Sequence, residues 1–178
     1  DEDLSNLSVL TRYVGGAVSS AMAHEEAAAL RDRDEVTGLP DAGYLTSRLQ
    51  AEVSRAQRFA GRLVLLSCKT SLRSHGESLD HRSRYRKLIR AVADAVRDTL
   101  RDYDIVACVG EGKFAMILPQ AEDGTVSATM RIKLAVERTV EEHKILLPGM
   151  DPETVFTMVR YPEDGKDAEA LLEILKSS

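Results

Sequence analysis

Arg101 and Asp104 are the residues of this chain whose types and spacing best suit recognition of a ligand. Arginine presents a planar fork of donors that fits guanine O6 and N7, or a phosphate group. A carboxylate only accepts hydrogen bonds, so it matches the N1–H and N2–H donors of guanine and rejects adenine, which lacks that pair. The Arg-x-x-Asp pair therefore predicts binding of a guanine nucleotide.

The same pair also has a purely structural interpretation. Residues three apart are neighbours on a helix surface, and an exposed ion pair there contributes well under about 1 kcal/mol. The surroundings favour a ligand, because eight lysines and arginines stand against four acids from Arg73 to Arg101. Such a local positive field steers phosphates. Arg97, one helical turn before Arg101, is a candidate for the same site.

The segment Gly110-Glu111-Gly112-Lys113-Phe114 is a second feature that could take part in chemistry. The apolar runs 105–109 and 113–118 are joined through Glu111 and Gly112, and an X-Gly turn predicts a β-hairpin. Lys113 is expected to face solvent on its strand. The alternative is that it contacts a phosphate, in a nucleotide pocket built on Gly110 and Gly112.

Helices and strands alternate around these two features. Apolar residues at helical spacing predict helices. The helix expected at 125–143 would have Met130, Leu134 and Val140 on its inner face. The segment from Lys69 to His81 is polar and is expected to be irregular. The pattern predicts an α/β fold with a mixed central sheet and flanking helices. The expected helices are 41–58, 85–100, 125–143 and 167–176, and the expected strands are 63–66, 105–109, 113–118 and 154–160.

Composition narrows the class of protein. A chain of 178 residues fits one domain plus an appendage, and a net charge of −5 argues against binding a nucleic acid polymer. Cys68, Cys108 and the four histidines show no metal-ligand spacing, so buried thiols in a reducing compartment are expected. No apolar run is long enough to cross a bilayer and no signal peptide pattern is present, which predicts a cytoplasmic location.

The first 33 residues are expected to form a separate helix. Apolar residues recur there at three- and four-residue steps, and Gly15-Gly16 weakens the helix locally. Such a helix would pack on a partner helix or an upstream domain, or it is merely a solvated end. Because the chain begins with Asp, a fragment of a longer protein is expected. The predicted organisation is a connector at 1–33 and a domain at 34–178.

Four ordered landmarks make residues 34–175 resemble the GGDEF domains, bacterial enzymes that make cyclic di-GMP. The landmarks are Asp34-Glu35-Val36-Thr37-Gly38-Leu39-Pro40, Arg101-Asp102-Tyr103-Asp104, the hairpin motif at 110–114 with Ala115-Met116-Ile117-Leu118-Pro119, and Tyr161-Pro162-Glu163-Asp164-Gly165. The resemblance implies a nucleotide-cyclase-like, ferredoxin-like palm preceded by a signalling helix. It also implies that Arg101 and Asp104 form an inhibitory site for cyclic di-GMP, assisted by another arginine, for which Arg131 is the candidate.

The carboxylates that this family uses to hold magnesium are missing. Gly112 and Lys113 stand where the hairpin should carry an acid, and a lysine there repels a metal. Leu66-Ser67-Cys68-Lys69 replaces the first-strand segment that should carry the other acid, and Thr70–Gly76 replaces a run that contacts the nucleotide. No Asp occurs between Asp41 and Asp80, so a small alignment error does not restore the acid. The family's terminal Lys-x-x-Gly-Arg-Asn is also absent. We therefore expect no cyclase activity and no magnesium.

The resulting hypothesis is a catalytically inactive GGDEF domain that binds cyclic di-GMP through Arg101, Asp104, Arg97 and Arg131, with no other cofactor. It would signal to an upstream sensor or output domain, with a homodimer through the N-terminal helix as a further expectation. No membrane insertion of this fragment is expected. Two alternatives stay open at this point: a structural or dimerising module without a ligand, and a pseudo-cyclase that senses GTP.

Overall fold

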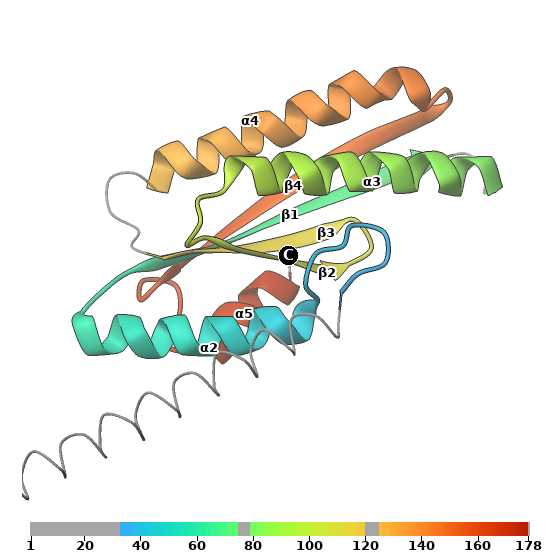
Figure 1. The fold of residues 1–178 in the computed structure, drawn as a ribbon. Helices are drawn as coiled ribbons and strands as arrows, with labels where there is room; N and C mark the ends of the chain where they lie inside the picture. Colours follow the sequence, from blue (N-terminus) through green and yellow to red (C-terminus); the bar gives the residue numbers. More distant parts are fainter. Residues whose placement is uncertain (1–32, 75–78, 120–124, 178) are drawn as a thin grey trace, which may run out of the picture.

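The fold is an antiparallel sheet between two layers of helices (Figure 1). The structure is a computed structural model, and it describes residues 33–74, 79–119 and 125–177. The predicted N-terminal helix at 1–33 therefore lies almost wholly outside the described residues. Within the described part, no helix combines the length and the apolar character needed to cross a membrane.

Four strands form the sheet in the order β2-β3-β1-β4: β1 (Leu63–Ser74), β2 (Ile105–Gly110), β3 (Lys113–Pro119) and β4 (Met150–Tyr161). All three pairings are antiparallel, so the expectation of a mixed sheet was wrong in this respect. The physical reason is the hairpin. Its return strand β3 lies between β1 and β2, so the two strands that α3 connects are never neighbours.

Each face of the sheet is covered by its own pair of helices. On one face lie α3 (Leu79–Thr99) and α4 (Thr125–His143), which pack against each other; on the other lie α2 (Ala42–Phe59) and α5 (Ala168–Lys176) (Figure 1). Two cores result, because strand side chains alternate between the faces. Phe114, Met116 and Cys68 point to the first core, and Leu65, Ile117 and Val159 to the second.

Local signals place the ends of several helices. The Asp41 carboxylate accepts a hydrogen bond from the Tyr44 N–H at 2.9 Å and so caps α2, as its sequence predicts. The Asp167 carboxylate caps α5 in the same way through the Ala170 N–H. The predicted bounds of α4 are confirmed at both ends, and a short 3₁₀ helix, Lys144–Leu146, follows it.

Several elements extend beyond their predicted bounds, among them β4, which begins at Met150 and not at Thr154. The two largest extensions are in β1 and α3. The segment after Lys69 was expected to be irregular, but β1 runs to Ser74 and α3 begins at Leu79. β1 pairs with β4 along its whole length, from Leu63 opposite Tyr161 to Ser74 opposite Met150. Polar side chains are compatible with this pairing because the ladder uses backbone groups. An Arg73–Glu153 ion pair of 2.8 Å then links the two exposed side chains.

The inner face of α4 also differs from the expectation. Met130 and Leu134 are 52% and 57% exposed, whereas Ile132, Val136 and Val140 are buried. At about 100° per residue, a side chain two positions from Ile132 points to the opposite side of the helix. The buried stripe follows the i+4 steps through Ile132, so the Met130–Leu134 pair was assigned to the wrong face.

Candidate functional site

Arg101 and Asp104 lie just after the end of α3 and form a tight turn. The Asp104 N–H donates to the Arg101 carbonyl at 3.0 Å, and the Arg101 N–H donates to Oδ2 of Asp104 at 2.9 Å. The helix ends at Thr99, so the two residues are not the helix-surface neighbours that the structural interpretation assumed. The Asp104 carboxylate holds the backbone of the turn, and it does not pair with the Arg101 guanidinium.

The Arg101 guanidinium is exposed and is positioned by an aromatic neighbour. Its Nη1 donates to the Tyr103 hydroxyl at 2.5 Å, and its central carbon lies 5.7 Å from the centre of the Tyr103 ring. The Tyr103 hydrogen bond, followed by smaller contributions that include Asp104, raises the pKa of Arg101 above its usual value. Tyr103 is itself 50% exposed. The turn therefore presents a permanent positive charge whose direction Tyr103 fixes.

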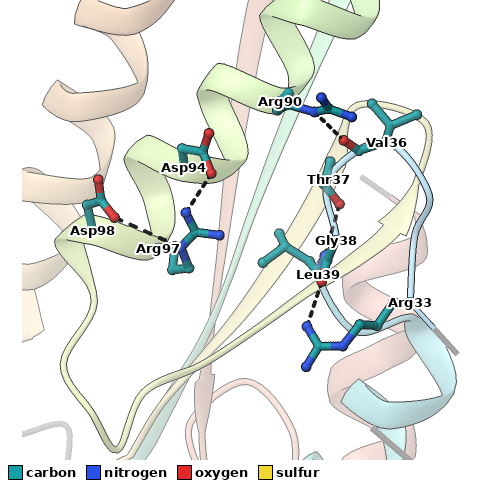
Figure 2. Close-up of polar contacts among 9 residues, drawn as sticks. All are labelled: Arg33, Val36, Thr37, Gly38, Leu39, Arg90, Asp94, Arg97 and Asp98. Atoms are coloured by element: carbon teal, nitrogen blue, oxygen red, sulfur yellow. Dashed lines mark hydrogen bonds and ion pairs between the residues drawn. The ribbon is translucent and has the colours of Figure 1, made fainter. Parts of the chain in front are cut away.

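Arg97 lies on α3, and its side chain contacts acidic residues of the same helix. Its guanidinium lies 2.7 Å from Oδ1 of Asp94 and 3.9 Å from Oδ1 of Asp98 (Figure 2). Among the described residues, no hydrogen bond or ion pair joins Arg97 to Arg101. A role for Arg97 in the site would require it to exchange these two carboxylates for the ligand.

Arg131 lies on α4 and is exposed. It has no hydrogen bond or ion pair with any of the described residues. α4 packs against α3 in the opposite direction, so the beginning of α4 and the end of α3 lie at the same end of the molecule (Figure 1). The Arg101–Asp104 turn follows directly after the end of α3. Arg131 therefore lies on the helix next to the one that leads to this turn, and its side chain has no partner among the described residues.

The hairpin turn is closely packed at Gly112. This glycine has φ +65°, and a Cβ added to it would lie 2.2 Å from the Tyr85 hydroxyl and 2.3 Å from the Thr70 carbonyl oxygen. The same two groups are bonded to each other, because the Tyr85 hydroxyl donates to the Thr70 carbonyl at 2.7 Å. The Gly112 carbonyl in turn accepts from the Thr70 N–H at 2.8 Å. No side chain, acidic or otherwise, fits at position 112 without rearrangement.

Tyr85 and Thr70 were not identified from the sequence as part of this motif. They are 15 residues apart and meet Gly112 only through the tertiary fold, so no local pattern indicates the contact. Burial, with a smaller contribution from Glu111, raises the pKa of Tyr85 to about 12. The hydroxyl therefore stays protonated, which its role as a donor to Thr70 requires. Glu111 itself is exposed at the tip of the turn.

Lys113 points to the face of the sheet that carries α5. Its Nζ donates to the Leu175 carbonyl at 2.9 Å, near the end of that helix, and the side chain is half-buried. The prediction of a solvent-facing lysine is therefore wrong in part, because the ammonium binds one of the last carbonyls of α5. Phe114, the next residue, points the other way and is fully buried. Gly110 has an ordinary contact, with Cβ of Lys113 3.8 Å from an added Cβ.

The strand register places the segment 66–69 beside the hairpin motif. Cys68 lies opposite Phe114, and Lys69 lies opposite Lys113. Burial raises the pKa of the Cys68 thiol to about 12, so this side chain is a neutral, apolar part of the core. The position that faces the motif across the sheet thus holds a thiol and an ammonium group, neither of which is a hard anionic oxygen ligand.

A groove of about 1230 Å³ runs between the first half of α3, the loop at 33–41 and the hairpin turn. The loop is fastened on both sides. Nε of Arg90 on α3 donates to the Val36 carbonyl at 2.8 Å (Figure 2). On the other side, the Cys108 N–H on β2 donates to the Pro40 carbonyl at 2.8 Å. Arg33 donates to the Gly38 carbonyl within the loop. Glu111 and Gly112 form part of the groove wall, whereas the Arg101–Asp104 turn does not line it.

Comparison with solved structures finds the same fold at low sequence identity. The GGDEF domain of PA1120 (TpbB or YfiN) from Pseudomonas aeruginosa has a TM-score of 0.57 at 19% identity, over 79% of this chain and 82% of that one. The GGDEF domain of DgcB from Caulobacter crescentus, in complex with cyclic di-GMP, has a TM-score of 0.54 at 15% identity, over 83% and 86%.

A microbial GGDEF domain whose structure describes its interaction with cyclic di-GMP has a TM-score of 0.60 at 15% identity, over 84% of this chain and 88% of that one. No curated protein matches the chain. The family model of the diguanylate cyclase GGDEF domain, however, matches residues 31–176. That match covers most of the chain, including the fastened loop, the turn and the hairpin. The chain therefore belongs to the GGDEF domain family.

Proposed function

We propose that this GGDEF domain makes no cyclic di-GMP and instead binds it at the Arg101–Asp104 turn. One observation carries the proposal. The Arg101 guanidinium is exposed, is held by Tyr103, and pairs with no carboxylate among the described residues. Eight other described arginines do pair with a carboxylate. Arg101 is therefore available for guanine or phosphate.

The geometry of Asp104 supports the same proposal. Within the described part of the chain, its Oδ2 accepts from the Arg101 N–H and its Oδ1 has no hydrogen bond, which leaves Oδ1 to accept from a ligand. A fixed carboxylate beside a fixed guanidinium matches both edges that guanine presents. Arg131 would assist from α4, and Arg97 would join only if it left Asp94 and Asp98.

The hairpin supports the absence of cyclase activity in this proposal. Metal-dependent phosphoryl transfer needs hard oxygen ligands for magnesium. At position 112 there is no room for a side chain, and Lys113 is turned toward α5 on the other side of the sheet. Cys68 and Lys69, opposite the motif, supply no carboxylate. We infer that no magnesium is held here.

Signalling would then pass from this domain to an upstream sensor or output domain. The loop at 33–41 precedes α2, and Arg90 fastens it to α3. The same helix α3 leads to the Arg101–Asp104 turn. α3 thus connects the proposed ligand site with the entry to the domain. A homodimer through the N-terminal residues, and a cytoplasmic setting, belong to the same proposal.

Isothermal titration calorimetry with cyclic di-GMP tests this function. We expect binding in the micromolar range or tighter, weakened by about 2–4 kcal/mol in Arg101→Ala. Arg58→Ala is the matched control, since Arg58 is an exposed arginine on α2 that makes no ion pair with the described residues. Ligand should also raise the melting temperature of the unsubstituted protein, because binding to the folded state stabilises it.

Three results would contradict the proposal. Unsubstituted protein that shows neither heat nor a thermal shift at millimolar cyclic di-GMP would leave the structural module as the better account. Sustained formation of cyclic di-GMP from GTP and magnesium would show that the domain is an active cyclase. Equal loss of affinity in Arg101→Ala and Arg58→Ala would place the ligand elsewhere.

A further inference from the structure

The two edges of the sheet are covered differently. At the β2 edge, the Cys108 N–H donates to the Pro40 carbonyl of the loop at 33–41. At the other edge lies β4, which has 12 residues and no further strand of the described part beside it (Figure 1). In an antiparallel ladder the backbone groups of alternate residues point to the neighbouring strand, and those of the residues between them point away. β4 therefore has an outer row of backbone groups that β1 does not use.

Both ends of this outer row are bonded within the domain. The Arg160 N–H donates to Oδ2 of Asp164, and the Arg160 carbonyl accepts from the Asp164 N–H, each at 2.8 Å. The Met150 N–H donates to the Leu147 carbonyl at 3.0 Å. Neither Arg160 nor Met150 points its N–H at β1, so the even-numbered residues of β4 form the outer row.

The middle of the outer row is open. The N–H and carbonyl groups of Thr154, Phe156 and Met158 belong to it, and they have no hydrogen-bond partner within the part of the chain that the structure describes. Pro152, which has no N–H, limits the row at one end, and Arg160, which is bonded to its own turn, limits it at the other. The open row is thus centred on Phe156 and bounded symmetrically.

The side chains along the open row form an apolar surface. Met158 is 49% exposed, and Val155, on the opposite face of the sheet, is 48% exposed. Phe156 is half-buried against the first core, and Nζ of Lys133 on α4 lies 6.0 Å from the centre of its ring. No residue from 154 to 159 carries a charge. An uncharged edge of this kind is suited to pairing with another strand, because charged side chains are what keep most edges unpaired.

We propose that β4 pairs with β4 of a second copy of this chain, antiparallel and about a two-fold axis at Phe156. In this register the two copies of Phe156 face each other, and Thr154 of each copy faces Met158 of the other. Each opposite pair exchanges two hydrogen bonds, so the three pairs use all the open groups of both rows. A shifted register would place Pro152 or Arg160 opposite an open residue and would lose hydrogen bonds. The row is complementary to itself, which identifies a second copy as its occupant.

Pairing at β4 closes on itself and therefore gives a dimer and not a filament. The two sheets would form one continuous sheet, with α4 of each copy on the same face. β4 and β2 are opposite edges of the sheet, so the Arg101–Asp104 turn, the loop at 33–41 and the groove stay accessible in the dimer. The interface does not depend on the proposed binding of cyclic di-GMP, and it is separate from the contact proposed through the N-terminal residues.

Sedimentation equilibrium of the full chain, without a ligand, tests the proposal. We expect the mass of the species present at low concentration to double as the concentration rises, whether that species is one chain or a dimer held by the N-terminal residues. Met158→Lys places a charge in the open row and should weaken this association by about tenfold or more. Ile145→Lys adds the same charge at a residue that is 85% exposed and lies outside β4, and it should weaken association by less than about threefold.

Cysteine substitution tests the register. Directly opposite residues of a hydrogen-bonded pair have Cα atoms about 5.5 Å apart, a separation that a disulfide can span. Phe156→Cys should therefore form a disulfide-linked dimer when oxidised with diamide, whereas the two copies of Met158→Cys would be about 13 Å apart and should not. A mixture of Thr154→Cys with Met158→Cys should link in the same way as Phe156→Cys, and it serves if Phe156→Cys fails to fold. Cys68 and Cys108 are buried, and the unsubstituted protein gives their background.

Three results would overturn the proposal. A mass that stays constant up to millimolar protein would leave the edge to a strand of another protein. Equal weakening by Met158→Lys and Ile145→Lys would place the association elsewhere on the molecule. A disulfide that forms as readily in Met158→Cys as in Phe156→Cys would exclude a two-fold axis at Phe156.

Discussion

The hairpin turn and the Arg101–Asp104 turn are near neighbours in sequence, but the fold treats them in opposite ways. At the hairpin, Gly112 is buried against Tyr85 and Thr70, and Lys113 is bonded to the end of α5. At the other turn, the guanidinium of Arg101 is exposed, and Tyr103 is its one hydrogen-bond partner among the described residues. Packing alone explains the residues of the hairpin. It does not explain the position of Arg101, for which we propose a ligand.

The sharpest challenge to this contrast is to return an acid to the hairpin. We expect Gly112→Asp to lower the free energy of unfolding by about 2–5 kcal/mol, because φ +65° disfavours a side chain and the new Cβ would overlap Tyr85 and Thr70. Urea denaturation measures the loss. Gly110→Ala, whose Cβ meets nothing closer than 3.8 Å, should cost less than about 1 kcal/mol.

If Gly112→Asp proved as stable as Gly110→Ala, the hairpin would have room for the family's carboxylate. The loss of the acid would then be a simple substitution, and the contrast between a packed hairpin and an open turn would not hold.

A pair of substitutions in the other turn examines its ligand chemistry. Asp104→Asn keeps the shape but presents an amide to the guanine donors, so we expect about 10- to 100-fold weaker binding of cyclic di-GMP. Asp102→Asn, an exposed acid in the same turn with no hydrogen bond to the described residues, should change affinity less than about threefold. Calorimetry with cyclic di-GMP and with cyclic di-AMP measures both affinity and base preference.

Equal effects of the two asparagine substitutions would mean that only the net charge of the turn matters. A preference for guanine that survives Asp104→Asn would move base recognition to another residue. Either result would remove Asp104 from the proposed site.

The parts of this molecule that the sequence predicts are those decided locally. The Asp41 cap, the two bounds of α4 and the hairpin through Glu111 and Gly112 depend on residues within a few positions of each other. The extension of β1 to Ser74 depends on β4, more than 70 residues away, and its polar side chains gave no periodic pattern. This end of β1 could not be predicted because its pairing with a distant strand, and not its own sequence pattern, makes it a strand.

The same distinction applies to the candidate site. The positions of Arg101 and Asp104 followed from their spacing to the hairpin, but the turn they form depends on where α3 ends, one residue earlier than predicted. The ion pair of Arg97 with Asp94 could have been predicted from their i, i+3 spacing on a helix, although we assigned Arg97 to the candidate site. The contact of Lys113 with the Leu175 carbonyl could not be predicted from the sequence, because only the packing of α5 brings the two residues together.

A smaller effect follows from that direction of Lys113. We expect Lys113→Met to lower the free energy of unfolding by about 1 kcal/mol, since the Leu175 carbonyl loses its donor and the end of α5 loses a positive charge. Lys69→Met, on the facing strand, removes an exposed lysine without a partner among the described residues and should change stability by less than about 0.5 kcal/mol. Urea denaturation compares the two; equal changes would show that Lys113 is not a structural contact of α5.

The last prediction uses pH to separate the packed hairpin from its surroundings. Burial raises the pKa of Tyr85 to about 12 from 10.0, so the folded state holds this proton more tightly than the unfolded state does. The resulting stabilisation is complete below pH 10 and is lost as the pH rises toward 12. Tyr85→Phe removes both the titration and the hydrogen bond to the Thr70 carbonyl, at a cost of about 1 kcal/mol at pH 7.

The difference in unfolding free energy between the unsubstituted protein and Tyr85→Phe should therefore stay constant from pH 7 to pH 9 and shrink above pH 10. Cys68, whose pKa burial raises to about 12, is present in both proteins, and its contribution cancels in the difference. Urea denaturation of both proteins at each pH measures this difference in unfolding free energy. A difference that does not change up to the alkaline limit would mean that the Tyr85 proton is not held by Thr70, and that the space beside Gly112 is more open to water than its contacts imply.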